Sequence, residues 1–227
     1  MRNSDVYIII PVFNEAQTIR SVIESLLPMG YKIVVVDDGS TDGTINSLDG
    51  FRLFYLRHEI NLGQGAALQT GITYALMMNA LVLVTFDGDG QHSAGDVDNL
   101  IKPLLLNEAD VVLGSRFLPS AFTNISFFKK EAIRVARLMN FLFTGVWLSD
   151  AHNGLRAFNS KAAAALDLKE NGMAHASEIL FTIHQSRLRI REIPASIYYT
   201  KYSKGKGQSV LNSIKVFFDI VLNRIFE

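Results

Sequence analysis

Short apolar runs rich in valine and isoleucine alternate with longer segments of helical periodicity in the first half of the chain. The short β-branched runs favour strands. Strands that alternate with helices are typical of a parallel sheet with helices on its faces, so we predict an α/β fold with a mostly parallel sheet flanked by helices. The predicted strands are Val6–Ile10, Ile33–Val36, Phe51–Leu56, Leu81–Phe86 and Val111–Leu113, and the predicted helices are Thr18–Leu27, Gly65–Met78 and Asp96–Leu106.

The pattern changes after Arg116. Residues 122–148 are rich in Phe and Leu, with Lys129, Lys130, Arg134 and Arg137 at roughly helical spacing. Neither a repeat nor a linker is present, so we predict one domain over residues 1–227. The later predicted elements are a strand Gly154–Phe158, helices Ser160–Leu166 and Ser177–Gln185, an extended piece Ile190–Tyr199, a flexible basic loop 201–209 and a helix Val210–Phe226.

The bulk composition fits a folded domain of 227 residues that buries a sizeable core, with 48% hydrophobic and 19% charged residues. The absence of cysteine excludes disulfides, thiolate metal sites and a cysteine nucleophile. No uncharged apolar stretch reaches the roughly 18 residues of a membrane span, and no secretory leader is visible, so we expect a cytoplasmic protein without a spanning helix.

The net charge of zero hides a strong asymmetry along the chain. Residues 1–113 contain 6 Lys/Arg and 14 Asp/Glu, whereas residues 114–227 contain 16 and 8. An acidic half offers ligands for cations, and a basic half suits phosphate or an anionic membrane surface. Simple attraction between the two halves is the plainer alternative.

Two aspartates directly follow the apolar run 80–86, in the segment Asp87-Gly88-Asp89-Gly90-Gln91. Alternate residues of an extended segment point the same way, so Asp87, Asp89 and Gln91 could converge on one ion. Oxygen ligands of this kind suit Mg²⁺ or Mn²⁺, which share their remaining positions with substrate phosphates. An EF-hand loop is excluded because His92 stands where that loop requires glycine. A surface turn remains the alternative.

A second polar edge, residues 37–43, follows the predicted strand 33–36. A carboxylate there could accept a hydrogen bond from an imide N–H or a ribose hydroxyl, or it could only cap the next helix. Asn14 is a candidate cap for the helix predicted at 18–27. Ligands of open parallel sheets collect at the carboxyl ends of the strands, where residues 11–15, 37–42 and 87–91 would meet.

Two further segments carry candidate chemistry. Gly63 and Gly65 open the predicted helix 65–78, but Leu68 replaces the third glycine of a dinucleotide fingerprint, and close packing of the helix on the sheet is the alternative. Asp150 is a candidate general base. The histidines show no metal-ligand spacing.

Taken together, these segments resemble family 2 glycosyltransferases, in particular the polyprenyl-phosphate sugar synthases of the dolichyl-phosphate mannose synthase type. The resemblance covers residues 6–160 almost continuously. The matching segments are Ile10–Glu15, Val36–Thr44, Asn61–Ala66, Asp87–His92, Gly114–Phe117 and Asp150–Phe158, with a looser match at Glu192–Pro194.

The resemblance implies a GT-A fold and an inverting transferase that uses a nucleotide-diphosphate sugar with Mg²⁺ or Mn²⁺. Residues 1–116 would form the nucleotide-sugar half, and residues 117–227 a largely helical acceptor-side half. Asp89 and Gln91 would bind the metal with Asp87 beside them, and Arg116 would lie near the diphosphate. The positions expected to contact the donor are Pro11, Phe13, Glu15, Val36, Asp38, Gly65 and Gly88.

The chain departs from the family pattern on the acceptor side. Thr200 replaces the usual arginine after the Glu-x-Pro motif, so Lys201, Lys204 or Lys206 would have to supply that charge. A lipid phosphate is already an anionic nucleophile and needs cations, whereas a sugar hydroxyl needs a general base. The basic apolar segments favour a phosphate at a membrane surface. Ordinary helix packing or a dimer interface would explain the same segments.

We therefore expect transfer to a polyprenyl phosphate by a protein that sits peripherally on the cytoplasmic membrane face. One alternative is transfer to a sugar hydroxyl of a polysaccharide or lipid-linked glycan, with Asp150 as base. Another is a non-catalytic scaffold that binds a membrane partner protein, against which the intact acidic motif counts. A homo-oligomer is compatible with the sequence, and we expect no nucleic-acid partner.

Overall fold

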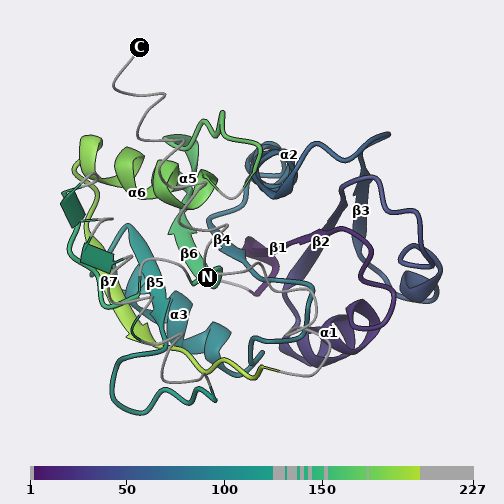
Figure 1. Cartoon of the computed structure of the whole chain (residues 1–227), viewed down its shortest axis with the longest axis horizontal. Coiled ribbons are helices and arrows are strands. Elements are labelled where there is room, and N and C mark those ends of the chain that lie inside the picture. Colours follow the sequence, from purple (N-terminus) through teal and green to yellow (C-terminus); the bar gives the residue numbers. More distant parts are fainter. Residues whose placement is uncertain are drawn as a thin grey trace.

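A seven-stranded sheet forms the centre of the described part of this computed structural model, with the strand order β3-β2-β1-β4-β6-β5-β7 (Figure 1). The structure describes residues 3–124, 131, 137–138, 141–142, 145–150, 153–172 and 174–199. The strands are β1 (Val6–Val12), β2 (Lys32–Asp37), β3 (Phe54–Arg57), β4 (Val82–Thr85), β5 (Val111–Ser115), β6 (Arg156–Asn159) and β7 (Ile190–Pro194).

The sheet is mostly parallel, as predicted, but β6 runs against its neighbours. β1 pairs in parallel with β2 and β4, β2 with β3, and β5 with β7. β6 is antiparallel to both β4 and β5 and lies between them. The alternation of strand and helix that predicts parallel pairing stops after β5, and the chain returns to the sheet through residues 116–155. The second half therefore supplies a central strand of the sheet.

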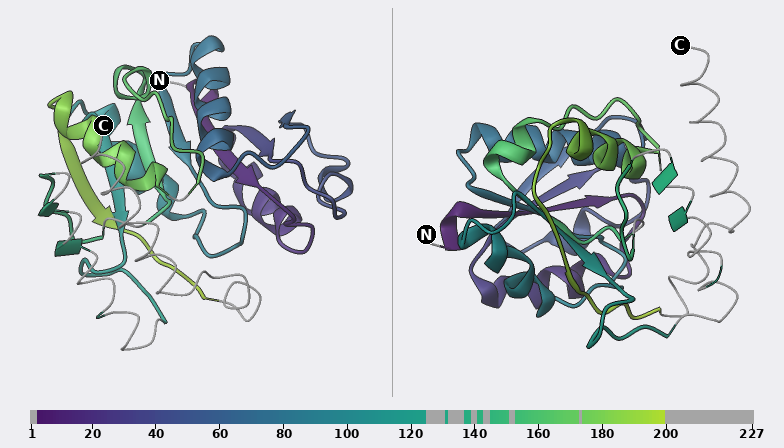
Figure 2. Two further views of the ribbon diagram at one scale, coloured as in Figure 1. Left: turned by 45° about the horizontal axis from the view of Figure 1, so that its top comes forward. Right: turned by 90° about the vertical axis from the view of Figure 1, so that its left-hand side faces the viewer.

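Helices cover both faces of the sheet (Figure 1, Figure 2). On one face α1 (Ile19–Leu26) and α3 (Asp96–Leu105) pack against β-strand residues such as Ile8 and Ile10. On the other face α2 (Gln64–Met77), α5 (Ser160–Ala164) and α6 (His175–Gln185) pack against residues such as Tyr7 and Ile9. Burial on both faces explains why the strands are continuous apolar runs.

The predicted elements agree with the structure within a few residues, with two differences of detail. The strand predicted from Phe51 begins only at Phe54, and the helix predicted from Ser177 begins at His175. The predicted basic loop 201–209 and helix 210–226 lie outside the described residues.

Asn14 was predicted to cap the first helix, and this is wrong. The helix begins after Thr18, and its cap has no side-chain hydrogen bond. The Asn14 side-chain oxygen instead accepts hydrogen bonds from the backbone N–H groups of Thr41, at 2.8 Å, and Asp42, at 3.3 Å. Asn14 thus ties the end of β1 to the polar segment after β2. The Asp42 carboxylate accepts from the N–H of Thr44 at 2.9 Å rather than from the 3₁₀ helix Asn46–Leu48.

His175 at the start of α6 makes the stability of the fold depend on pH. Burial, together with the positive charge of Arg156, lowers the pKa of His175 from 6.5 to about 4, although a hydrogen bond to the Gly172 carbonyl opposes the shift. The unfolded chain therefore binds a proton between pH 6.5 and 4 that the folded chain does not. We expect the free energy of unfolding to fall by about 3 kcal/mol as the pH drops through this range.

Urea titrations at pH 7.5 and pH 4.5 measure this effect. The His175→Gln variant should lose most of the pH dependence, because glutamine does not titrate. The matched His184→Gln variant, at the exposed end of the same helix, should keep it. An equal slope in His175→Gln and in the unmodified protein would contradict the assignment.

Candidate active site

The acidic segment after β4 lies at the carboxyl edge of the sheet, beside the ends of β1 and β2. The three strands are parallel, so the segments that follow them emerge at one edge. The acidic segment packs closely against these neighbours. The Thr18 hydroxyl donates to the Gly88 carbonyl at 2.8 Å, and a Cβ at Gly88 would stand 2.8 Å from Val12. Gly88, predicted to contact the donor, is thus required for close packing on β1.

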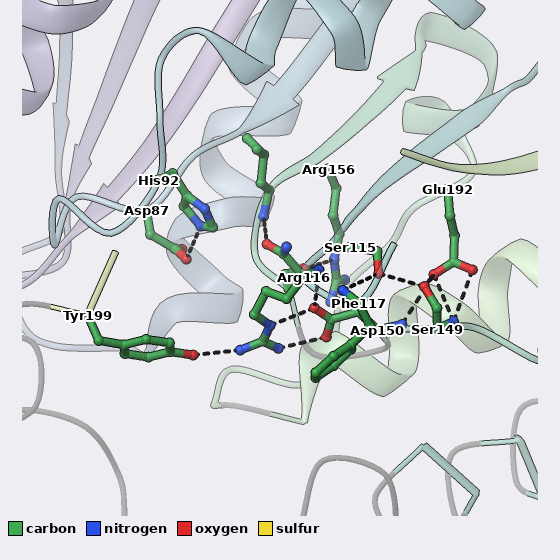
Figure 3. Close-up of polar contacts among 12 residues, drawn as sticks. Asp87, His92, Ser115, Arg116, Phe117, Ser149, Asp150, Arg156, Glu192 and Tyr199 are labelled. Carbon is green, nitrogen blue, oxygen red and sulfur yellow. Dashed lines mark hydrogen bonds and ion pairs between the residues drawn. The ribbon is translucent and has the colours of Figure 1, made fainter. Parts of the chain in front are cut away.

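Asp87 is tied to His92 in this segment (Figure 3). Its Oδ2 lies 2.8 Å from His92 Nε2, and Gln64 donates to its Oδ1 at 3.2 Å. Burial alone would raise the pKa of Asp87, but the hydrogen bond and charge of His92 lower it below its ordinary value. The side chain is still 29% exposed, so ligand access from one side is open. The contact between Asp87 and His92 was missed by the sequence analysis, although both residues belong to the matched motif.

Asp89 and Gln91, two of the three predicted metal ligands, are in contact with each other. Asp89 Oδ1 accepts from the backbone N–H of Gln91 at 3.0 Å, and Oδ2 contacts the Gln91 amide group. Burial and the negative charge of Asp87 raise the pKa of Asp89 above its ordinary value. Two carboxylates that repel each other at a sheet edge are stabilised by a cation, because it offsets both charges.

The residues at this edge fit a hard divalent cation. The described residues include no group of three or more His, Cys, Asp or Glu side chains placed to hold a metal. The candidate ligands are therefore two carboxylates and one amide, all with oxygen atoms. Such a set suits Mg²⁺ or Mn²⁺, which take their remaining ligands from water and substrate phosphates.

The predicted donor residues on or just after β1 and β2 differ in which of their atoms a ligand could reach. Pro11 and Val36 are paired across the two strands, and both are buried. The Val36 side chain faces α2, where a Cβ at Gly71 would lie 3.2 Å from it, so only its backbone can meet a ligand. Phe13 is 42% exposed at the strand end. The Glu15 carboxylate accepts from the Thr18 hydroxyl at 3.0 Å.

Asp38 organises the loop between β3 and α2. Its Oδ1 contacts His58 Nδ1 at 2.7 Å and the Leu62 N–H at 2.9 Å, and its Oδ2 accepts from the Gly63 N–H at 2.7 Å. The side chain is almost completely buried. The structure therefore shows at this position a carboxylate that anchors the loop before α2 through three contacts.

Gly65, another predicted donor residue, packs against the segment that precedes α6. Its N–H donates to the Asn171 carbonyl at 2.7 Å, and a Cβ at Gly65 would stand only 2.0 Å from the Glu170 carbonyl. The open face of this glycine is thus filled by the backbone of residues 170–171, so Gly65 packs against this segment and not, as the packing alternative had it, against the sheet.

We expect Gly63→Ala to destabilise the fold strongly. Gly63 has φ +104°, and an added Cβ would lie 2.3 Å from the Asn171 carbonyl oxygen. Gly50 provides the matched control because it has φ +86° with nothing within 4 Å of an added Cβ. Gly50→Ala should cost only backbone strain, and Gly63→Ala should cost about 2 kcal/mol more because of the clash. Urea unfolding of the two variants measures the difference, and equal losses would contradict the packing described.

Arg116 and Asp150 form a buried ion pair just after the end of β5 (Figure 3). The Arg116 Nε and Nη2 donate to the two oxygens of Asp150, each at 2.6 Å, and the side chains are 7% and 0% exposed. Burial opposes the charge of Arg116, but the hydrogen bonds and charge of Asp150 outweigh it and raise the pKa of Arg116. Arg116 and Asp150, predicted in separate roles, are therefore one unit.

Two residues that the sequence analysis did not single out complete this unit. The Glu192 carboxylate accepts from the backbone N–H groups of Ser149, at 2.9 Å, and Asp150, at 3.2 Å. Arg116 Nη1 donates to the Tyr199 hydroxyl at 2.7 Å. The looser motif match at Glu192–Pro194 was a signal for Glu192, and it does not reach Tyr199. The predicted cations Lys201, Lys204 and Lys206 lie outside the described residues.

Comparisons with known proteins identify similar chains. The profile of glycosyl transferase family 2 matches residues 7–166. An uncharacterized protein of Methanocaldococcus jannaschii is 34% identical, covering 100% of this chain and 95% of its own. A UDP-N-acetylglucosamine–dolichyl-phosphate N-acetylglucosaminyltransferase of Methanococcus voltae is 32% identical, covering 98% and 97%.

The fold also matches solved structures. Glucosyl-3-phosphoglycerate synthase from Mycobacterium tuberculosis, solved with Mn²⁺, UDP and glucosyl-3-phosphoglycerate, superposes with a TM-score of 0.71 at 19% identity. The match covers 93% of this chain and 75% of the mycobacterial chain. At this identity the likeness concerns the GT-A fold, which confirms the predicted fold class.

Proposed function

The chain belongs to glycosyltransferase family 2, and from that premise we propose that it transfers a sugar, with inversion, from a nucleotide-diphosphate sugar to a polyprenyl phosphate. It is a glycosyltransferase by family. The finer proposal rests on the charged groups at the carboxyl edge of the sheet. The acidic Asp87–Asp89 segment and the Arg116–Asp150 pair lie there on the two sides of β6. The Methanococcus voltae relative, similar over nearly its full length, supports a lipid-phosphate acceptor.

On the donor side, Asp89 and Gln91 would hold Mg²⁺ or Mn²⁺, with Asp87 beside them. The bound cation would supply positive charge that the leaving diphosphate needs more in the transition state than before it. His92 holds Asp87 in place and keeps it ionised. Phe13 and the backbone at Pro11 and Val36 border the edge where the nucleotide would bind.

On the acceptor side, the geometry favours a phosphate over a hydroxyl. Both Asp150 oxygens accept hydrogen bonds from Arg116, and the Asp150 side chain is completely buried. To act as a general base, Asp150 would have to leave this ion pair and become accessible to the acceptor. An ionised lipid phosphate needs no base. It needs hydrogen-bond donors beside positive charge, and Arg116 would offer the two N–H groups that Asp150 and Tyr199 leave.

We place the protein peripherally at the membrane that carries such a lipid. Trp147 is 55% exposed, and the Arg137 guanidinium lies 4.7 Å from its ring centre. Leu142 nearby in the chain is 64% exposed. Tryptophan, arginine and exposed leucine together suit the interface between water and lipid. In the part of the chain that the structure describes, no helix has both the length and the apolarity to cross a membrane.

A transfer assay tests this function. Purified protein is incubated with UDP-N-acetylglucosamine, UDP-glucose or GDP-mannose, Mn²⁺, and either undecaprenyl phosphate, dolichyl phosphate or a free oligosaccharide. We expect metal-dependent formation of a lipid-linked sugar from one donor, and abolition by EDTA. Transfer to the oligosaccharide but to neither lipid would favour the hydroxyl alternative, and binding without any transfer would favour the scaffold alternative.

A further inference from the structure

The guanidinium of Arg116 is held from two sides, by Asp150 and by Tyr199. Arg116 Nε and Nη2 donate hydrogen bonds to Asp150 on one edge, and Nη1 donates to the Tyr199 hydroxyl. A guanidinium has five N–H donors in a fixed plane, so these contacts leave two of them for another acceptor. Because the fork is planar, fixing two of its edges also fixes the direction of the remaining donors.

Glu192 holds the segment 149–150 in place through hydrogen bonds, and with it the guanidinium edge that faces Asp150. Its carboxylate accepts from the Ser149 N–H at 2.9 Å, the Ser149 hydroxyl at 2.7 Å and the Asp150 N–H at 3.2 Å. Glu192 lies on β7 opposite Leu113 of β5, the strand that leads into Arg116. The sheet therefore carries both the arginine and the residue that fixes its carboxylate partner.

Tyr199 holds the other edge of the guanidinium. Its segment also contacts the acidic loop. The backbone of Tyr199 exchanges hydrogen bonds with the side chain of Asn124, at 2.9 and 3.2 Å. The neighbouring Tyr198 N–H donates to the carbonyl of Gln91, the candidate metal ligand, at 2.9 Å. The segment 198–199 thus contacts the acidic loop through one residue and Arg116 through the next.

We propose that Glu192 and Tyr199 are positioning residues for sugar transfer, which hold the Arg116 guanidinium so that its two remaining donors stay directed at a phosphate oxygen of the substrates. This role rests on the proposed function. Tyr199 additionally links the geometry of Arg116 to that of the acidic loop. Neither residue needs to touch substrate for this role.

A spectroscopic measurement tests the positioning without any substrate. The Nε–H signal of Arg116 is identified in a ¹⁵N spectrum by its loss in Arg116→Lys, and its hydrogen exchange is measured. We expect Glu192→Gln to accelerate exchange by about tenfold or more, because an amide cannot accept from three donors as the carboxylate does. Tyr199→Phe should shift the signal, because it removes only the hydroxyl.

Two matched variants control for general loosening of the fold. Glu178→Gln weakens a carboxylate that accepts from two backbone N–H groups, those of Lys169 and Glu170, on another side of the molecule. Tyr198→Phe removes the hydroxyl of the adjacent, 47% exposed tyrosine. Both should leave the Arg116 signal unchanged. If Glu192→Gln has no greater effect than Glu178→Gln, the positioning role of Glu192 is overturned.

A double-mutant cycle then connects positioning to transfer. With the active donor and acceptor, Glu192→Gln and Tyr199→Phe should each lower kcat by about tenfold or more while the donor KM changes little. In the Arg116→Lys background, neither should have a further effect, because both act through the planar fork. Additive losses would overturn the proposal. Altered Nε–H exchange in a protein that transfers no sugar would instead refute the proposed function alone.

Discussion

Asp89→Asn is expected to reduce sugar transfer by at least about a hundredfold and to abolish the response of nucleotide binding to Mn²⁺. The substitution keeps the shape of the side chain but removes its charge. Asp89 has an elevated pKa because it is buried and faces the charge of Asp87. The asparagine variant removes this repulsion, so the fold should be as stable as before or slightly more stable. Loss of function together with retained stability is the combination that identifies a metal ligand.

Calorimetric titration of UDP with and without Mn²⁺, combined with urea unfolding, measures both quantities. Asp49→Asn, at the C-terminal cap of the 3₁₀ helix Asn46–Leu48, removes one negative charge away from the site and should change neither. If Asp89→Asn kept metal-dependent binding of UDP, the acidic segment would not be the metal site.

Asp150→Asn is expected to lower the free energy of unfolding by about 3 kcal/mol and to reduce transfer to a trace. The substitution leaves the buried Arg116 with a neutral partner, and removing one member of a buried ion pair costs much more than removing both. The double variant Arg116→Met with Asp150→Leu should therefore recover most of the stability while transfer stays lost. Recovery of the fold without recovery of activity separates the catalytic need for Arg116 from its structural contribution.

Variants of Asp150 and Arg116 also distinguish the two acceptor chemistries. If Asp150 served as a general base, Asp150→Glu would keep part of the activity toward a hydroxyl acceptor, and the rate would follow the ionisation of the carboxylate. For a lipid phosphate acceptor, the rate of transfer should instead depend on whether the Arg116 guanidinium keeps its position. Transfer by the double variant at a rate close to that of the unmodified protein would contradict any role of Arg116.

Most of the sheet could be predicted from the sequence, because its strands are buried on both faces. Residues 33–36 and 82–85 have no exposed side that could hold polar residues, so the apolar runs mark these strands to within one or two residues. The same logic located the acidic edge after β4, since polar residues begin where burial stops.

The contacts between distant segments could not be predicted. Arg116 and Asp150 are separated by 34 residues, and Glu192 lies 42 residues beyond Asp150. Local patterning gives no information on which side chains meet across such distances. Asn14 shows the same limit at shorter range, because its preference for capping was overridden by the segment after β2.

The position of β6 also bears on how the molecule forms during synthesis. β6 is made late, yet it lies between β4 and β5. Until residue 159 leaves the ribosome, the nascent sheet consists of the β3-β2-β1-β4 block with a bare apolar edge. Pairing across such sequence separation is slow, and an uncovered edge invites association with other chains. A fragment that stops at residue 116 should therefore aggregate, although it contains the whole acidic motif.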